Sequence, residues 1–318
     1  MAEENKIKLL AVVGPTASGK TALSVKLAKA LGGEIVSCDS MQIYRRMDVG
    51  TAKPTAEEQC GVAHHLFDIA EPDKAYSCAD YVRDAKAAIQ EISARGRLPI
   101  LCGGTGLYLD SLLRGGNFEE TVTDLALREE LQAFAQAHGN HALHERLAEV
   151  DPESAEAIHE NNVKRVIRAL EIYLTTGMTK TEADLRSRRF ASPYDATVIG
   201  LRFEDRDLLY SRIDRRVEEM MQNGLLDETR RLLAEGVFER NSTAAQAIGY
   251  KELIGYLQGE SDLAESVEIL KRATRRYAKR QLTWFGAKDY VRWITLDQNG
   301  EMRDGEDILQ AAHNLIKT

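Results

Sequence analysis

The sequence predicts an α/β fold in which an open parallel sheet has helices on both faces and carries an all-helical insertion. Four short apolar runs are typical of buried parallel strands, at residues 9–13, 34–38, 97–102 and 196–201. Glycine-rich turns follow the first and third runs and lead into segments with helical spacing. Between residues 123 and 189 the apolar positions show helical spacing and no strand pattern. We therefore expect a core made of residues 1–120 and 195–318 and a helical insertion at residues 121–194.

The first predicted strand runs into a glycine-bounded loop with the pattern G-x-x-x-x-G-K-T, the P-loop pattern in the strand–loop–helix context that it requires. Gly14 and Gly19 allow backbone angles that a Cβ would hinder, so successive N–H groups can converge on phosphate oxygens. Lys20 adds a full positive charge, and the hydroxyl of Thr21 can ligate Mg²⁺. We therefore expect a P-loop NTPase-like core that binds a pyrophosphate or polyphosphate through Gly14, Pro15, Thr16, Ala17, Ser18, Gly19, Lys20 and Thr21.

Two further segments follow strands at the same edge, where open α/β sheets bind their ligands. Asp39 follows the second predicted strand, and it either faces the reacting group or caps the next short helix; the residues alone favour neither role. Gly103-Gly104-Thr105 forms a second glycine-rich turn, whose N–H groups and Thr105 hydroxyl can donate to an anion. An arginine such as Arg216, after the last of the four strands, is a candidate further cation. The apolar-run-plus-acid pattern of a hydrolytic Walker B element is missing from the early strands.

Basic residues gather in two helical regions. The insertion is rich in arginine, including Arg128, Arg165 and Arg168, and the run from Lys271 to Arg280 contains no acid. Cations four residues apart on a helix repel one another, so an unpaired run with flanking aromatic residues indicates phosphate contact and base stacking. The alternative is a set of solvated helix faces paired with nearby acids such as Glu171.

Composition excludes several classes of protein. The 318 residues are 43% hydrophobic and 29% charged, as in soluble globular proteins. No signal peptide precedes the first strand, and no apolar run reaches the roughly 18 residues of a membrane span. The four cysteines lack the spacing of zinc sites and fit core thiols in a reducing compartment. We expect a cytoplasmic monomer without a membrane partner, and the net charge of −8 leaves a local nucleic-acid site open.

Seven motifs occur in the order, and near the separations, of one known family. They are Gly14–Thr21, Asp39–Tyr44, Asp48–Pro54, Gly103–Thr105, Asn161–Glu171, Gly249–Glu252 and Ala278–Phe285. Together they resemble the bacterial tRNA dimethylallyltransferase, or isopentenyl-tRNA transferase, family over nearly the whole chain. The resemblance implies a prenyltransferase that moves a dimethylallyl group from dimethylallyl diphosphate to N6 of the tRNA adenosine just 3′ of the anticodon, with release of diphosphate.

The resemblance also implies roles for individual residues. The P-loop binds the diphosphate together with Mg²⁺, and Asp39 is the general base that takes a proton from N6. Lys20, Thr105 and Arg216 stabilise the charge that develops on the leaving diphosphate. The insertion clamps the anticodon stem-loop. The residues that contact tRNA are Asp39, Ser40, Met41, Gln42, Arg128, Arg165, Arg168, Lys279, Arg280 and Gln281.

Three alternatives compete with this interpretation. A small-molecule or nucleoside kinase would use the same P-loop with Arg212 and Arg216 over the phosphates, and would leave the run from Lys271 to Arg280 unexplained. A related enzyme would prenylate free AMP or ADP and need little surface for RNA. A non-catalytic tRNA-binding protein would have no use for an intact Lys20 and Asp39.

Overall fold

The computed structural model describes residues 6–114, 124–188, 192–241 and 243–317. The chain divides into two compact units, one made of residues 1–113 with 193–318 and one of residues 114–192. The predicted boundary between residues 120 and 121 lies outside the described residues. Within the described ranges, no helix is both long enough and apolar enough to cross a membrane.

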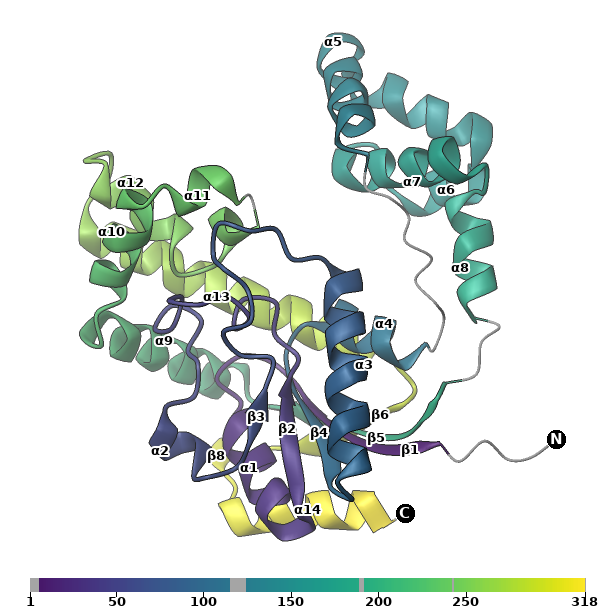
Figure 1. Ribbon diagram of the computed structural model, residues 1–318. Coiled ribbons are helices and arrows are strands. Elements are labelled where there is room, and N and C mark those ends of the chain that lie inside the picture. The colour runs from purple at the N-terminus through teal and green to yellow at the C-terminus, as the bar shows by residue number, and fades with distance from the viewer. Residues whose placement is uncertain (1–5, 115–123, 189–191, 242, 318) are drawn as a thin grey trace, which may run out of the picture. The chain divides into compact units, whose positions relative to one another are not determined.

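A six-stranded parallel sheet forms the centre of the first unit (Figure 1). Its strands are β1 (Ile7–Val13), β2 (Gly33–Ser37), β3 (His64–His65), β4 (Leu98–Gly103), β5 (Tyr194–Arg202) and β6 (Val291–Thr295). They lie in the order β3-β2-β4-β1-β5-β6, and Val13 of β1 is in register with Gly103 on one side and Gly200 on the other. The loops that leave β1 and β4 therefore begin side by side at one edge. The predicted open parallel α/β fold is confirmed.

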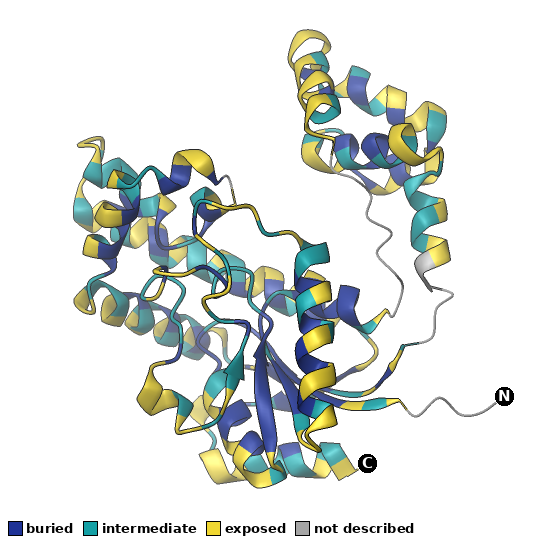
Figure 2. Ribbon diagram, in the orientation of Figure 1, coloured by how far each residue is buried: buried dark blue, intermediate teal, exposed yellow. Residues whose placement is uncertain are grey.

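Helices cover both faces of this sheet. Successive side chains of a strand point to opposite faces, so Leu9, Ala11 and Val13 enter one apolar core, while Leu10 and Val12 enter the other. The first core is closed by α3 (Cys78–Ala94), α4 (Gly106–Leu113) and the end of α13 (Leu263–Gly286); the second is closed by α1 (Lys20–Leu31), α9 (Arg206–Gln222) and α14 (Gly305–Lys317). Figure 2 shows the strands largely buried and the outward sides of the helices exposed.

A third apolar cluster joins the segment after β2 to a group of short helices. Ile43, Tyr44 and Met47 pack there with residues of α10 (Leu225–Ala234), α11 (Val237–Arg240) and α12 (Lys251–Leu257). Residues 244–257 do not form one helix: the structure has a 3₁₀ turn at Ala244–Gln246 and then α12. Gly249 lies between them with a φ of 110°, which interrupts the helix. Two small elements complete the unit, α2 (Ala56–Gln59) and a hairpin of β7 (Asp297–Gln298) and β8 (Glu301–Met302).

Helices are the only regular secondary structure among the described residues of the second unit. It contains α5 (Leu125–Val150), α6 (Pro152–Ala157), α7 (Val163–Thr176) and α8 (Lys180–Arg188). Gly139 breaks the helical backbone inside α5 with a φ of 89°. Leu131 and Leu147 of α5 pack against Val166 and Leu170 of α7 in a separate apolar core. The unit therefore has its own core, as a folded insertion requires.

Candidate active site

The P-loop leaves the carboxyl end of β1 in a conformation that depends on glycine. Gly14 has a φ of 146° and Gly19 a φ of 83°, and a Cβ on Gly14 would lie 2.7 Å from the carbonyl oxygen of Leu201. Ala17 adopts a φ of 62°, which is costly for a residue other than glycine. α1 begins at Lys20 without a side-chain cap, so its first N–H groups can bind an anion.

Side chains from two distant helices hold this loop in place. The side-chain oxygen of Gln281, on α13, accepts a hydrogen bond from the N–H of Thr16 at 2.9 Å, and Arg212 of α9 donates to the carbonyl oxygen of Ala17 at 3.0 Å. The side-chain nitrogen of Gln281 donates to the carbonyl oxygen of Gly104 at 3.1 Å, so Gln281 joins the P-loop to the second glycine-rich turn. Gln281 is 5% exposed and both ends of its amide are bonded inside the protein, so the side chain has a structural role, and its contact with RNA stays a prediction.

Two cations lie at the loop with little compensating charge. The Nζ of Lys20 donates to the carbonyl oxygen of Pro15 at 2.6 Å, and burial lowers the pKa of Lys20 to about 8. Arg216 of α9 has no ion-pair partner in the described part of the chain, and burial lowers its pKa as well. Asp39 is close enough to both cations to oppose these shifts in part. The hydroxyl of Ser18 is buried with no hydrogen-bond partner among the residues described. A bound diphosphate would supply the partners that these groups lack.

Asp39 lies in a turn after β2, so the alternative in which it caps a helix is wrong. One of its carboxylate oxygens accepts a hydrogen bond from the N–H of Met41 at 2.9 Å, which makes an Asx turn. The hydroxyl of Thr105 accepts a hydrogen bond from the N–H of Ser40 at 3.0 Å. The Asp39 turn and the second glycine-rich turn are thereby bonded to each other at the edge where the P-loop lies.

Tyr277 of α13 belongs to this site, although the sequence analysis did not single it out. Its hydroxyl lies beside Thr105, and burial, together with the charge of Asp39, raises the pKa of Tyr277. The guanidinium of Arg280 lies 5.6 Å from the centre of the Tyr277 ring. Tyr277 precedes Gln281 by four residues and so shares its side of the helix, a spacing that could have indicated it.

The basic run on α13 divides into two faces. Lys271 pairs with Glu218 of α9 at 2.9 Å and with Glu268 at 3.0 Å, and Arg275 pairs with Asp214 of α9. The expectation that the whole run is unpaired is therefore wrong, because acids of α9, and Glu268 just before the run on α13 itself, pair with two of its cations. Four cations of the run are exposed and have no ion-pair partner within the described ranges: Arg272, Arg276, Lys279 and Arg280. We call these four residues the α13 basic stripe.

Two arginines of the insertion, Arg128 and Arg168, also have a partner inside their own unit. Glu171 of α7 is fully buried, and its carboxylate accepts hydrogen bonds from Arg128 at 2.8 and 2.9 Å and from Arg168 at 2.5 Å. RNA contact by Arg128 and Arg168 stays a prediction, but both side chains have a structural role. Arg165 is exposed and has no ion pair in the described part of the unit.

The three residues after Asp39 were predicted to contact tRNA. The side chains of Ser40 and Met41 are partly exposed. The side-chain nitrogen of Gln42 donates to the carbonyl oxygens of Thr51 at 3.1 Å and Ala52 at 3.3 Å, so this side chain is bonded to its own chain. For all three residues, contact with RNA stays a prediction.

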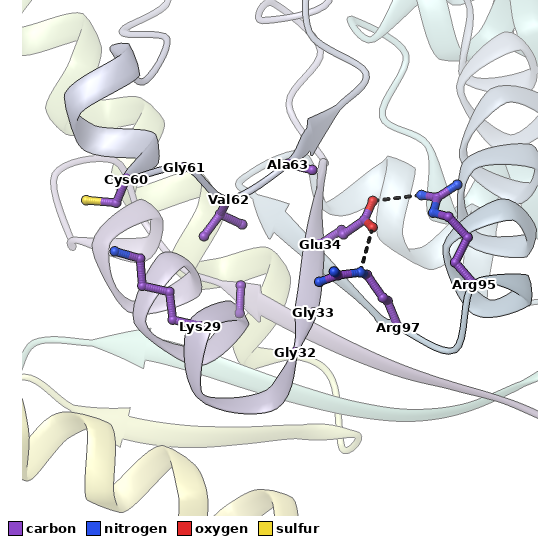
Figure 3. Close-up of a pocket in the computed structure, with 11 residues that line it drawn as sticks. Lys29, Gly32, Gly33, Glu34, Cys60, Gly61, Val62, Ala63, Arg95 and Arg97 are labelled. Atoms are coloured by element: carbon purple, nitrogen blue, oxygen red, sulfur yellow. Dashed lines mark hydrogen bonds and ion pairs between the residues drawn. The ribbon is translucent and has the colours of Figure 1, made fainter.

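A cavity of about 550 Å³ lies at the amino ends of β2 and β4, the edge opposite the P-loop (Figure 3). Glu34 enters it and pairs with Arg95 at 2.8 Å and Arg97 at 3.5 Å. These two guanidinium groups are therefore already compensated. None of the predicted catalytic residues lines the cavity.

The fold and the site together define an α/β protein with a phosphate-binding P-loop beside a carboxylate. The chain belongs to the IPP transferase family, whose model matches residues 42–288.

Relatives and solved structures agree with this assignment. The chain is 52% identical to a tRNA dimethylallyltransferase of Halalkalibacterium halodurans over 98% of this chain and 97% of the relative. It is 47% identical to a tRNA dimethylallyltransferase of a Thermoanaerobacter species, over 98% of this chain and 97% of that relative. A crystal structure of the tRNA isopentenylpyrophosphate transferase of Bacillus halodurans matches 98% of this chain and 96% of its own, with 48% identity and a TM-score of 0.73. A eukaryotic dimethylallyltransferase acting on tRNA matches 98% of this chain and 80% of its own, with 25% identity and a TM-score of 0.80.

Proposed function

We propose that this protein transfers the dimethylallyl group of dimethylallyl diphosphate to N6 of the tRNA adenosine just 3′ of the anticodon, and releases diphosphate. One observation carries the proposal: a P-loop lined by the buried cations Lys20 and Arg216 lies at the same sheet edge as Asp39. Relatives that are about half identical to this chain over nearly their full length are tRNA dimethylallyltransferases, which supports the same reaction.

The diphosphate of the donor binds at the P-loop. Backbone N–H groups, Lys20, Arg216 and the buried hydroxyl of Ser18 stabilise the negative charge that grows on the leaving oxygen as the bond from carbon to that oxygen breaks. The backbone of the loop is held before the reaction by Gln281 at Thr16 and by Arg212 at Ala17, so little reorganisation of the loop is needed when the charge develops. Thr105 adds a hydroxyl at the same edge.

The adenine amine is the acceptor. Its nitrogen lone pair forms the new bond to the allylic carbon, while the electron pair of the broken bond leaves with the diphosphate. The proton lost from N6 passes to Asp39, which keeps one carboxylate oxygen outside the bond to the Met41 N–H.

Mg²⁺ fits the donor set of this site. The hydroxyl of Thr21 lies in the first turn of α1, directly after Lys20, and hydroxyl and phosphate oxygens are ligands that Mg²⁺ prefers. When bound, Mg²⁺ would supply additional positive charge to the diphosphate. The protein itself contributes the positive charges of Lys20 and Arg216 to the binding of the diphosphate.

The RNA binds through phosphate contacts at the α13 basic stripe and at Arg165 of the insertion. The stripe is exposed and unpaired within the described chain, so it offers cations at no cost in broken ion pairs. A target adenine in a folded stem-loop must leave its stack to reach Asp39, at a cost of a few kcal/mol.

A single assay tests the proposed function against its rivals. Purified protein is incubated with labelled dimethylallyl diphosphate and Mg²⁺, together with anticodon stem-loop RNA, the same RNA with the target adenosine replaced by guanosine, or free AMP. We expect label only in the first RNA, and none with Asp39→Ala. Label in AMP alone would favour the free-nucleotide prenyltransferase, and turnover of ATP in a parallel incubation with ATP and no RNA would favour the kinase.

A further inference from the structure

Glu228 of α10 is a buried carboxylate that the reaction described above does not use. It is 7% exposed and accepts four hydrogen bonds. One oxygen accepts from the N–H groups of Asp48 and Val49, both at 3.0 Å. The other accepts from the N–H of Gly50 at 3.0 Å and from the hydroxyl of Tyr250 at 2.7 Å. Three successive backbone N–H groups therefore converge on one side chain that lies about 180 residues away in the chain.

The segment that Glu228 holds is bonded directly to the turn that carries Asp39. The side-chain nitrogen of Gln42 donates to the carbonyl oxygens of Thr51 and Ala52 at 3.1 and 3.3 Å. The side-chain oxygen of Gln42 accepts from the hydroxyl of Ser37 at 3.3 Å. Ser37 and Gln42 lie on either side of Asp39 in the sequence, so Gln42 ties both ends of its turn to the 48–52 segment.

The segment has little freedom to move. The ring of Tyr250 lies so close to Gly50 that a Cβ there would be 2.3 Å from the ring. The hydroxyl of Thr51 donates to the carbonyl oxygen of Met47 at 2.6 Å, which closes the segment on itself. A shift of the segment would leave buried N–H groups without acceptors, which is costly.

We propose that Glu228 is a positioning residue for the transfer reaction. It fixes the 48–52 segment, and through Gln42 it holds Asp39 where the carboxylate can take the N6 proton. This inference rests on the proposed function of Asp39. A carboxylate suits the role because both oxygens accept, whereas the amide of a glutamine would turn N–H groups toward two of the four donors.

The test uses the full-length protein with Glu228→Gln. We expect the single-turnover rate at saturating donor and RNA to fall about tenfold or more, since small misplacements of a catalytic group are costly. The Kd for dimethylallyl diphosphate should stay within about twofold of wild type, because the P-loop is held by other residues. Glu34→Gln is the matched control: Glu34 is also 7% exposed and hydrogen-bonded, but it lies at the opposite sheet edge. Its rate should stay within about twofold of wild type.

A double variant separates positioning from a general loss of structure. If Glu228 acts through Asp39, Glu228→Gln should slow the Asp39→Ala protein no further, because the group that it positions is already gone. Tyr250→Phe keeps the ring packing and removes one of the four hydrogen bonds, so it should show the same pattern at a smaller amplitude, about two- to fivefold, even if Glu228→Gln does not fold. An unchanged rate in Glu228→Gln, or effects that add fully to those of Asp39→Ala, would overturn the inference. Failure of the proposed function is distinguishable, because Asp39→Ala would then by itself leave the rate unchanged.

Discussion

Removing the side chain of Gln281 separates the role given to it by the structure from the role predicted by the sequence. In Gln281→Ala, the N–H of Thr16 and the carbonyl oxygen of Gly104 both lose their partner. Gln281 is 5% exposed, so water reaches these groups poorly. We expect damage to the P-loop and to stability, and no direct damage to RNA binding.

The expected magnitude follows from the two broken hydrogen bonds. Each buried group left unsatisfied costs about 1–3 kcal/mol, so the free energy of unfolding should fall by about 3 kcal/mol. A P-loop freed from α13 must be ordered again by its ligand. We expect the Kd for a diphosphate to rise about tenfold, which corresponds to about 1.4 kcal/mol.

The assays are urea unfolding, calorimetric titration with diphosphate, and the salt dependence of binding to stem-loop RNA. The matched control is the double variant Lys279→Ala, Arg280→Ala on the same helix. It should leave unfolding unchanged and lower the slope of log K against log salt by about 2, since two phosphate contacts are lost. Gln281→Ala should instead lower the free energy of unfolding and leave the salt slope of RNA binding unchanged. Wild-type stability and diphosphate affinity in Gln281→Ala, combined with a lower salt slope, would refute this reasoning.

Two further predictions concern charge. Because burial lowers the pKa of Lys20 to about 8, the charged fraction of Lys20 in the free protein falls about tenfold between pH 7 and pH 9. The Kd of dimethylallyl diphosphate should rise about tenfold over that range in wild type and change little in Lys20→Arg. Calorimetric titration at pH 7 and pH 9 measures both values. A wild-type Kd that is the same at the two pH values would contradict the prediction. In the insertion, burial alone would raise the pKa of Glu171, but hydrogen bonds from Arg128 and Arg168 hold it below its usual range. Its stabilising effect should therefore be present at neutral pH and be lost as the pH falls below about 4, toward the folded-state pKa. Glu171→Gln should lower the free energy of unfolding at pH 7 by about 2–3 kcal/mol, a value discounted because both arginines are partly exposed. It should also flatten the acid dependence of stability, measured by thermal unfolding followed by circular dichroism. A melting temperature equal to that of wild type would contradict the stabilising role of the Glu171 ion pairs.

The sheet and the P-loop could be predicted from sequence because their determinants are local. A strand pattern, a glycine loop and a helical repeat each occupy a dozen residues or fewer, and the order of such units restricts the topology. The site edge followed from the rule that ligands bind beyond the carboxyl ends of parallel strands. From the sequence alone, that rule places Lys20, Asp39 and Thr105 at one edge.

The contacts that complete the site could not be predicted in this way, because their partners are distant in sequence. Gln281 meets Thr16 across 265 residues, and Glu228 meets Asp48 across 180. The pairing of Lys271 and Arg275 with acids of α9 likewise depends on how two helices pack. A basic run that contains no acid is therefore a weaker sign of nucleic acid than the four cations that packing leaves exposed.

The central claim is that the P-loop holds the leaving diphosphate while Asp39 takes the proton from the acceptor amine. The most direct measurement is the single-turnover rate of Asp39→Asn on stem-loop RNA, with the dissociation constants of both substrates measured on the same preparation. We predict near-normal binding of both substrates and a rate about 10²–10⁴-fold below wild type, as expected for loss of a general base. A rate within a few-fold of wild type, with both substrates bound, would contradict the account.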